Sequence, residues 1–163
     1  MIRYEDIKNN PEIKYYIEAA DRSLAEIGYT EHSFAHVGSV GKNAEDILLA
    51  IGTDPRRAEL AKIAGYMHDI GNMVNRRDHS QSGAIIAFRI LDKMGMEPEE
   101  IATVVSAIGN HDEGTGSPVS DVAAALILAD KSDVRRSRVR NEDNLAFDIH
   151  DRVNYSVDRK SVV

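Results

Sequence analysis

The stretch AGYMHDIGN, residues 64–72, determines how this chain is interpreted, because it places a His-Asp pair at the end of an apolar helix pattern. The apolar residues that lead up to the pair recur at spacings of three and four: Leu60, Ile63, Ala64 and Met67. This spacing predicts a helix with one buried face. His68 follows Ala64 by four positions, so it extends that face to the C-terminal end of the helix, shortly before Gly71.

The same helical spacing continues on both sides of this stretch. It predicts helices over about residues 11–27, 33–51, 55–68, 85–94, 98–108 and 122–130. Pro11, Pro55 and Pro98 suit the first turns of three of them. No alternation typical of a strand occurs in the first 130 residues. We therefore predict an all-α fold, a compact helical array of about six or seven helices in one domain.

The pattern weakens in the tail, residues 141–163. Its segment IHDRVNYSVDRKSVV, residues 149–163, could begin either a helix or a short hairpin. The sequence therefore leaves the structure after residue 141 open, with an irregular or β tail among the alternatives.

The composition excludes several classes of protein. With 20 Lys and Arg against 27 Asp and Glu the net charge is −7, which disfavours general binding to nucleic-acid polymers or to anionic membranes. Cysteine is absent, which excludes disulfides, thiolate metal sites and cysteine nucleophiles. Neither a signal segment nor a run of ~18 apolar residues is found. We expect a cytoplasmic protein, and the oligomeric state is left open, with a homo-oligomer included.

Side chains that commonly bind metals recur at the ends of the predicted helices. Besides His68 and Asp69 they are His36 at the start of helix 33–51, His79 before helix 85–94, His111 after helix 98–108, and Asp130 at the end of helix 122–130. Helix ends that converge would gather these groups in one cleft. Mixed imidazole and carboxylate ligands suit Fe, Mn, Co, Ni or Zn.

The dipeptide His-Asp occurs three times, and only its context separates the copies. His68-Asp69 ends an apolar helix, whereas His111-Asp112 lies in the loop GNHDEGTGSP, residues 109–118. His150-Asp151 lies in the weakly patterned tail and is predicted to be on the surface. We therefore take His68-Asp69 as the functional pair and, from the second copy, only the histidine.

This arrangement resembles the HD-domain superfamily of metal-dependent phosphohydrolases. The stretches that carry the resemblance are HVGSV at 36–40, AGYMHDIGN at 64–72 and LILADKSD at 126–133. The resemblance covers about residues 30–135, the expected core of one domain spanning 1–163. It implies a site with two divalent metal ions, Asp69 being the bridging and catalytic carboxylate. The implied ligands are His36, His68, Asp69, His79, His111 and Asp130.

Other polar residues near these ligands have several interpretations. His32 is four residues before His36 and shares its helix face. It could be a substitute ligand, a ligand of a third metal or an exposed polar residue. Asp112 and Glu113 could be loop residues in solvent or could orient His111. Asp133 is predicted to be a surface residue.

A basic cluster follows Asp130 directly. It consists of Lys131, Arg135, Arg136, Arg138 and Arg140, and a smaller pair, Arg76 and Arg77, precedes His79. Such a run usually marks a solvated face. Beside a metal site it suits an anionic phosphate ester, because Arg and Lys bind phosphate. We assign a catalytic role to Lys131 and substrate binding to Arg76, Arg77, Arg135 and Arg136. A continuing helix would place Arg138 about 12 Å from Asp130.

The function expected from the resemblance is hydrolysis of a small phosphate ester, a nucleotide or a related molecule. The stretch HDIGN, residues 68–72, is similar to the HDIGK motif of cyclic-dinucleotide phosphodiesterases, so that activity is an alternative. Asn72 in place of the lysine argues against it. Two further alternatives are a non-catalytic HD module that senses a ligand and a plain helical interaction domain. The presence of all six candidate ligands favours an enzyme.

Overall fold

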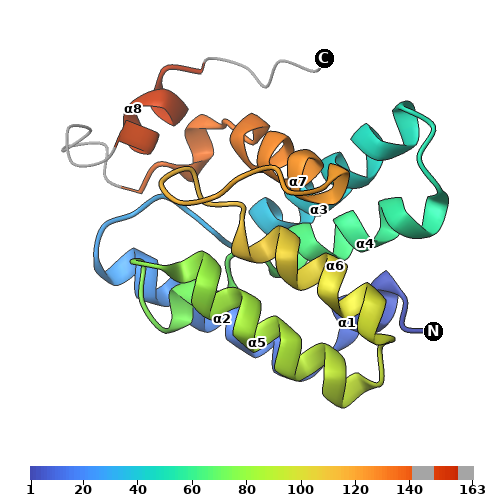
Figure 1. The fold of residues 1–163 in the computed structure, drawn as a ribbon. Helices are drawn as coiled ribbons and strands as arrows, with labels where there is room; N and C mark the ends of the chain where they lie inside the picture. Colours follow the sequence, from blue (N-terminus) through green and yellow to red (C-terminus); the bar gives the residue numbers. More distant parts are fainter. Residues whose placement is uncertain (141–148, 158–163) are drawn as a thin grey trace.

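All regular structure in the described part of the chain is helical (Figure 1). The computed structural model describes residues 1–140 and 149–157. The α-helices are α1 (Tyr4–Asn9), α2 (Pro11–Glu26), α3 (Phe34–Ala50), α4 (Pro55–Met67), α5 (His79–Met94), α6 (Pro98–Gly109), α7 (Asp121–Ser132) and α8 (Ile149–Tyr155). Two short 3₁₀ helices, η1 (Ile70–Met73) and η2 (Arg136–Arg138), follow α4 and α7. The predicted all-α fold is confirmed.

The six predicted helices correspond to α2 through α7, and their starts follow from local chemistry. The Asn10 side chain accepts hydrogen bonds from the backbone N–H groups of Glu12 and Ile13 at the start of α2. Asp54 caps α4 in the same way, and Ser120 caps α7. Such caps satisfy backbone donors that have no partner within the helix. The helix α1 was not predicted, because six residues with one buried position, Ile7, show no period.

Helices α3 and α4 cross in direct backbone contact. A Cβ atom added at Gly65 would lie 2.7 Å from the Cα of Gly41, so the two backbones meet without side chains between them. Helix α7 packs against both α3 and α4. Around this crossing lie fully buried apolar side chains, among them Val40, Ile63 and Leu126. The crossing brings the start of α3 close to the end of α4.

A second group of helices lies on the other side of α6. Helices α2 and α5 are joined through side chains, because Arg89 and Lys93 on α5 donate to Glu12 on α2 at 2.7 Å and 3.1 Å; both helices lie at the lower side of the molecule in Figure 1. The short helix η1, directly after the His-Asp pair, packs against both of them. No helix in residues 1–140 and 149–157 is long and apolar enough to cross a membrane.

The chain after α7 differs from the expectation of a continuing helix. Helix α7 ends at Ser132, and η2 runs in a new direction. In the tail, residues 149–155 are helical, so of the alternatives left open this part adopts the helix and not the hairpin. The rest of the open tail, 141–148 and 158–163, lies outside the described residues.

Candidate metal centre

The structure brings all six candidate ligands together. His36 lies in the first turn of α3, and His68 and Asp69 lie between α4 and η1. His79 is the first residue of α5, His111 is the second residue after α6, and Asp130 is in the last turn of α7. Five are buried, and the Asp130 side chain is 14% exposed. Five segments of the chain therefore contribute to one cluster.

One half of the cluster surrounds Oδ2 of Asp69. The Nε2 atoms of His36 and His68 lie 3.4 Å and 3.0 Å from Asp69 Oδ2. The same two atoms lie 3.3 Å and 3.6 Å from Asp130 Oδ1. Ligand bonds of about 2.1 Å place two ligand atoms of one ion about 3.4 Å apart in a tetrahedron, and about 3.0 Å or 4.2 Å apart in an octahedron. These four side chains therefore have the spacing of one metal's ligand set.

The other half of the cluster faces the second oxygen of Asp69. His79 Nε2 lies 3.5 Å from Asp69 Oδ1 and 3.1 Å from His111 Nε2. These separations also match the ligand spacing around one ion. Asp69 thus presents one oxygen to each half, the arrangement that a bridging carboxylate requires.

The histidine rings are held with Nε2 toward the cluster. In each ring Nδ1 faces an oxygen that only accepts, so Nδ1 carries a proton and Nε2 is the nitrogen that a metal would bind. The acceptors are Asp133 Oδ2 for His36 at 2.8 Å, Gly65 O for His68 at 2.8 Å, Arg76 O for His79 at 3.1 Å and Ile108 O for His111 at 2.7 Å. Metal-binding histidines are usually oriented in this way.

Three atoms at the centre of the cluster make no hydrogen bond to any described residue. They are His36 Nε2, His68 Nε2 and Asp69 Oδ2, and all three are buried. A buried polar atom without a partner costs about 1–3 kcal/mol. A cation among these atoms would satisfy all three at once, so the residues present fit a divalent metal.

The charges of the cluster also favour a cation. Burial alone would raise the pKa of Asp69 and of Asp130, but the facing histidines hold both well below the usual range. Burial alone would lower the pKa values of His36 and His68, but the carboxylates around them raise these to about 9 and about 10. Burial lowers the pKa of His111 to about 4 and that of His32 to about 3. A metal must therefore displace protons from His36 and His68.

Comparison with known proteins identifies the family. Residues 33–145 match the HD domain. The chain belongs to the HD domain family. A crystal structure of a predicted HD superfamily hydrolase from an uncultured Thermotogales bacterium is similar, with a TM-score of 0.56 and 26% identity over 79% of this chain and 72% of that one. The superfamily generally comprises metal-dependent phosphohydrolases, which agrees with the His/Asp cluster.

Two relatives extend the comparison. An uncharacterised protein of Methanocaldococcus jannaschii is 25% identical over 98% of this chain and 70% of its own length. Ribonuclease Y of Opitutus terrae is 30% identical over 119 residues, 73% of this chain. The match spans only 21% of that ribonuclease.

Gly71 and Asn72, which follow the His-Asp pair, determine how η1 packs and how the Asp69 carboxylate is held. A Cβ atom at Gly71 would lie 1.9 Å from the backbone oxygen of His79, so only glycine lets η1 approach the start of α5. Asn72 donates from Nδ2 to Asp69 Oδ1 at 2.9 Å and to the Asp69 backbone oxygen at 3.0 Å. Asn72, noted in the sequence only as a replacement for lysine, thus holds the Asp69 carboxylate.

The prediction that Asp133 is a surface residue is wrong. Asp133 is 3% exposed and accepts the hydrogen bond from His36. Arg135 donates to its two carboxylate oxygens at 2.9 Å and 3.0 Å. Asp133 is the C-cap of α7, where the chain turns inward. Its position three residues after Asp130 was the available signal, one helical turn from a ligand.

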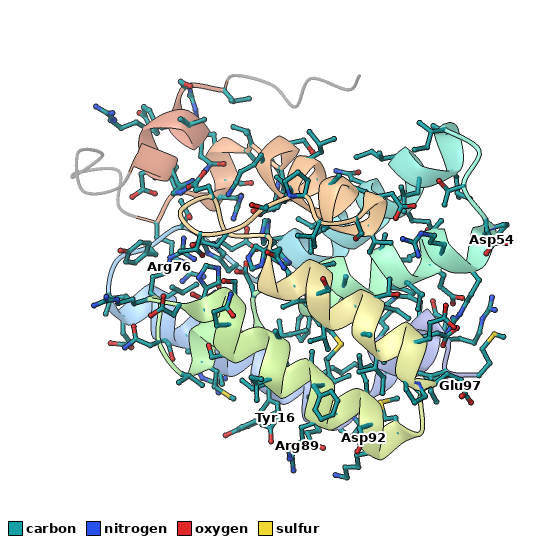
Figure 2. The ribbon with its side chains drawn as sticks, in the orientation of Figure 1. Tyr16, Asp54, Arg76, Arg89, Asp92 and Glu97 are labelled. Atoms are coloured by element: carbon teal, nitrogen blue, oxygen red, sulfur yellow. The ribbon has the colours of Figure 1, made fainter. Side chains whose placement is uncertain are left out.

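A cavity of about 390 Å³ opens onto the cluster. Three cationic side chains line it, Arg76, Lys131 and Arg138. Lys131 Nζ lies 3.1 Å from Asp130 Oδ2, and the Arg76 guanidinium lies 3.3 Å from His79 Nε2. Figure 2 shows Arg76 near the start of α5, on the side of the molecule that carries α8. Arg138 reaches the cavity because the chain turns after Ser132.

The other three arginines assigned to substrate binding are not among the described residues that line the cavity. The Arg77 side chain is 90% exposed beside Asp78. Arg135 binds Asp133, and Arg136 lies over the ring of Tyr155. In the structure, Arg76 is the one of the four that reaches the cavity.

The prediction that His150-Asp151 lies on the surface is wrong for Asp151, whereas the His150 side chain is 35% exposed. Helix α8 packs against η2, and His150, Val153 and Asn154 line the cavity. His150 Nε2 lies 3.3 Å from Glu113 Oε1, and Asp151 is 1% exposed. The weak periodicity of the tail gave no signal for this packing, because α8 has only seven residues.

Proposed function

We propose that this HD domain is a metal-dependent phosphohydrolase that cleaves a small phosphate ester, a nucleotide or a molecule of similar size. The observation that carries the proposal is Asp69, whose two oxygens face two sets of ligand atoms while buried donor atoms around it lack partners. A cavity of about 390 Å³ lies within the range of small-molecule sites.

The proposed ligands divide into two sets that share Asp69. His36, His68 and Asp130 would hold one ion, and His79 and His111 the other. When bound, two divalent ions would acidify a water molecule and neutralise charge on the phosphate oxygens. Asn72, Asp133 and the backbone oxygens behind the histidines keep these donors in place.

The cations around the cavity suit the anionic substrate. Arg76 and Lys131 would bind phosphate oxygens and stabilise the charge that develops on them. Arg138 donates to the backbone oxygens of Glu31 and Asp133 at 3.0 Å and 2.8 Å, which fixes its guanidinium at the wall of the cavity. No side-chain nucleophile is needed for this reaction.

The experiment measures metal content and hydrolysis on the same protein. Purified protein is loaded with Mn, Fe, Co, Ni or Zn, and bound metal is determined by elemental analysis. A panel then compares a phosphate monoester, a phosphodiester, mononucleotides, a cyclic dinucleotide and a short oligoribonucleotide, the last because one relative is a ribonuclease. We expect about two equivalents of metal and hydrolysis of a small ester. Protein that stays metal-free with every ion would refute the proposal, and metal without hydrolysis would favour a sensing module.

A further inference from the structure

His32 is a fifth histidine directed at the metal centre, and the six proposed ligands do not include it. Its Nε2 lies 3.9 Å from Asp69 Oδ2, and its ring packs edge-to-face on His36 with centroids 5.3 Å apart. Its Nδ1 donates to the backbone oxygen of Thr30 at 2.7 Å. Like the four histidines in the proposed ligand set, His32 therefore turns Nε2 toward the cluster and Nδ1 toward an acceptor.

The loop before α3 holds His32 in this position through its backbone. The N–H of His32 donates to Asp21 Oδ1 at 2.8 Å, and the N–H of Glu31 donates to the backbone oxygen of Arg138 at 2.8 Å. Asp21 in turn accepts from Arg140. The loop is thus tied to α2 on one side and to η2 on the other.

Three potential ligand atoms lie within 4.8 Å of one another, one each from His32, His36 and Asp69. This is the spacing of a metal-binding group. An imidazole nitrogen binds one ion, so His36 Nε2 cannot serve both this group and the set that includes His68 and Asp130. A separate third ion is therefore not supported. His32 instead adds a donor to the set that His36 already belongs to.

We propose that His32 is a further ligand of the ion held by His36, His68, Asp69 and Asp130. The proposal rests on the metal centre of the proposed function. Five protein donors leave one position of an octahedron for water or substrate. Such a set favours ions that accept six ligands, such as Mn, Fe, Co or Ni, over Zn, which prefers four.

The alternative is that His32 only packs against His36. In that case its replacement would change the stability of the metal-free protein and leave the metal's ligand field as it was. Co²⁺ separates the two cases, because its visible absorption reports the number and geometry of its ligands.

The test titrates metal-free protein with Co²⁺ and follows affinity and visible spectrum, with chelator competition for tight binding. The variants are His32→Gln and His32→Ala, and the control is His150→Gln, whose side chain lines the cavity outside the cluster. We expect both His32 variants to bind one of two Co²⁺ equivalents at least about 10-fold more weakly, with stronger absorption from fewer ligands. The control should match the wild type.

Circular dichroism on each sample checks the fold. If His32→Ala does not fold, His32→Gln still tests the proposal, because its side chain is polar and closer in size to histidine. Wild-type affinity and spectrum in a folded His32 variant would overturn the assignment of His32. Wild-type protein that binds no Co²⁺ or other divalent ion would instead overturn the metal centre itself.

Discussion

Two charged clusters are built into this HD domain, and they differ in how far their polar atoms are satisfied. Near the N-terminus, Arg56 on α4 donates to both oxygens of Glu100 at 2.7 Å and 2.6 Å, to Glu59 at 2.7 Å and to the Ile2 backbone oxygen at 2.8 Å. Glu59 also accepts from the N–H of Tyr4 at 2.9 Å. At the other end of α4, His36, His68 and Asp69 leave buried atoms without partners.

The difference separates a structural cluster from a binding one. The Arg56 cluster needs nothing from outside, so it connects α1, α4 and α6 as part of the fold. The His/Asp cluster is held as firmly from behind, yet its central atoms are unsatisfied. A protein keeps such atoms when a ligand completes them. The predictions below test this contrast, from the largest expected effect to the smallest.

The first prediction removes the shared carboxylate. Asp69→Ala should abolish hydrolysis and weaken metal binding by more than about 1000-fold, because both ligand sets lose a donor. Elemental analysis and kcat/KM on the same sample measure this. His150→Ala is the control for metal content only. It is not a control for the rate, because His150 lines the cavity and its loss could alter substrate binding. Metal retained by Asp69→Ala would contradict the two-set arrangement.

The second prediction concerns pH. The metal-free pKa values of about 9 for His36 and about 10 for His68 lie above the ordinary value of about 6.5. Metal affinity should therefore rise with pH up to about 10, by about 10-fold per unit for each proton displaced. The stability that these raised pKa values give the metal-free protein is complete below pH 6.5 and is lost through pH 9–10.

Calorimetric titrations in buffers of different ionisation enthalpy would count the protons released. An affinity that does not change between pH 6.5 and 8.5 would contradict displacement of protons from either histidine.

The third prediction separates the cations at the cavity from those outside it. Lys131→Met should lower kcat/KM by about 30- to 1000-fold, equivalent to about 2–4 kcal/mol, with metal content unchanged. Arg136→Gln should stay close to the wild type, because Arg136 lies over Tyr155 outside the cavity lining. Equal losses in both variants would mean that the basic run acts as a whole.

The fourth prediction tests the satisfied cluster. Glu59→Gln should destabilise the protein by about 2 kcal/mol, because Arg56 loses a charged acceptor in a largely buried position. Metal content and kcat should not change. Chemical denaturation with and without metal measures the effect, and loss of metal in this variant would show that the two ends of α4 are coupled.

The fifth prediction concerns Asp133, which accepts the hydrogen bond from the proposed ligand His36. Asp133→Asn should weaken metal binding by about 10-fold, since the amide is a poorer acceptor for His36 Nδ1–H than the carboxylate. Arg135→Gln should have a smaller effect of the same kind, because it holds Asp133 from one side. A rate loss at saturating metal with unchanged affinity would assign Asp133 a different role.

The sequence predicted the parts of this structure that depend on local chemistry. Pro11, Pro55 and Pro98 and the apolar stripes located α2 through α7, and the ends of those helices carried the candidate ligands. Helix ends that face one cleft are a consequence of packing amphipathic helices around a core, so the gathering of His36, His68 and Asp130 followed from their positions in the stripes.

The parts that sequence patterns could not predict depend on the path of the chain between helices. Asp133 and Arg138 turn inward only because α7 stops at Ser132, and nothing in a run of charged residues signals that turn. His32 faces Asp69 because its loop is tied to Asp21 and Arg138, residues distant in sequence. These contacts are properties of the folded chain.

The crossing of α3 over α4 fixes the width of the opening that an ion must fit. Gly41 lies five residues after His36, and the carbonyl of Gly65 holds the His68 ring, so the backbone contact that sets the helix separation also sets the distance between these two imidazoles. A methyl group at either glycine would clash with the backbone of the other helix and push the two helices apart. The spacing of the proposed ligands therefore depends on a contact between two glycines that supply no ligand atom themselves, and a substitution at Gly41 or Gly65 should change the ionic radius that the centre prefers.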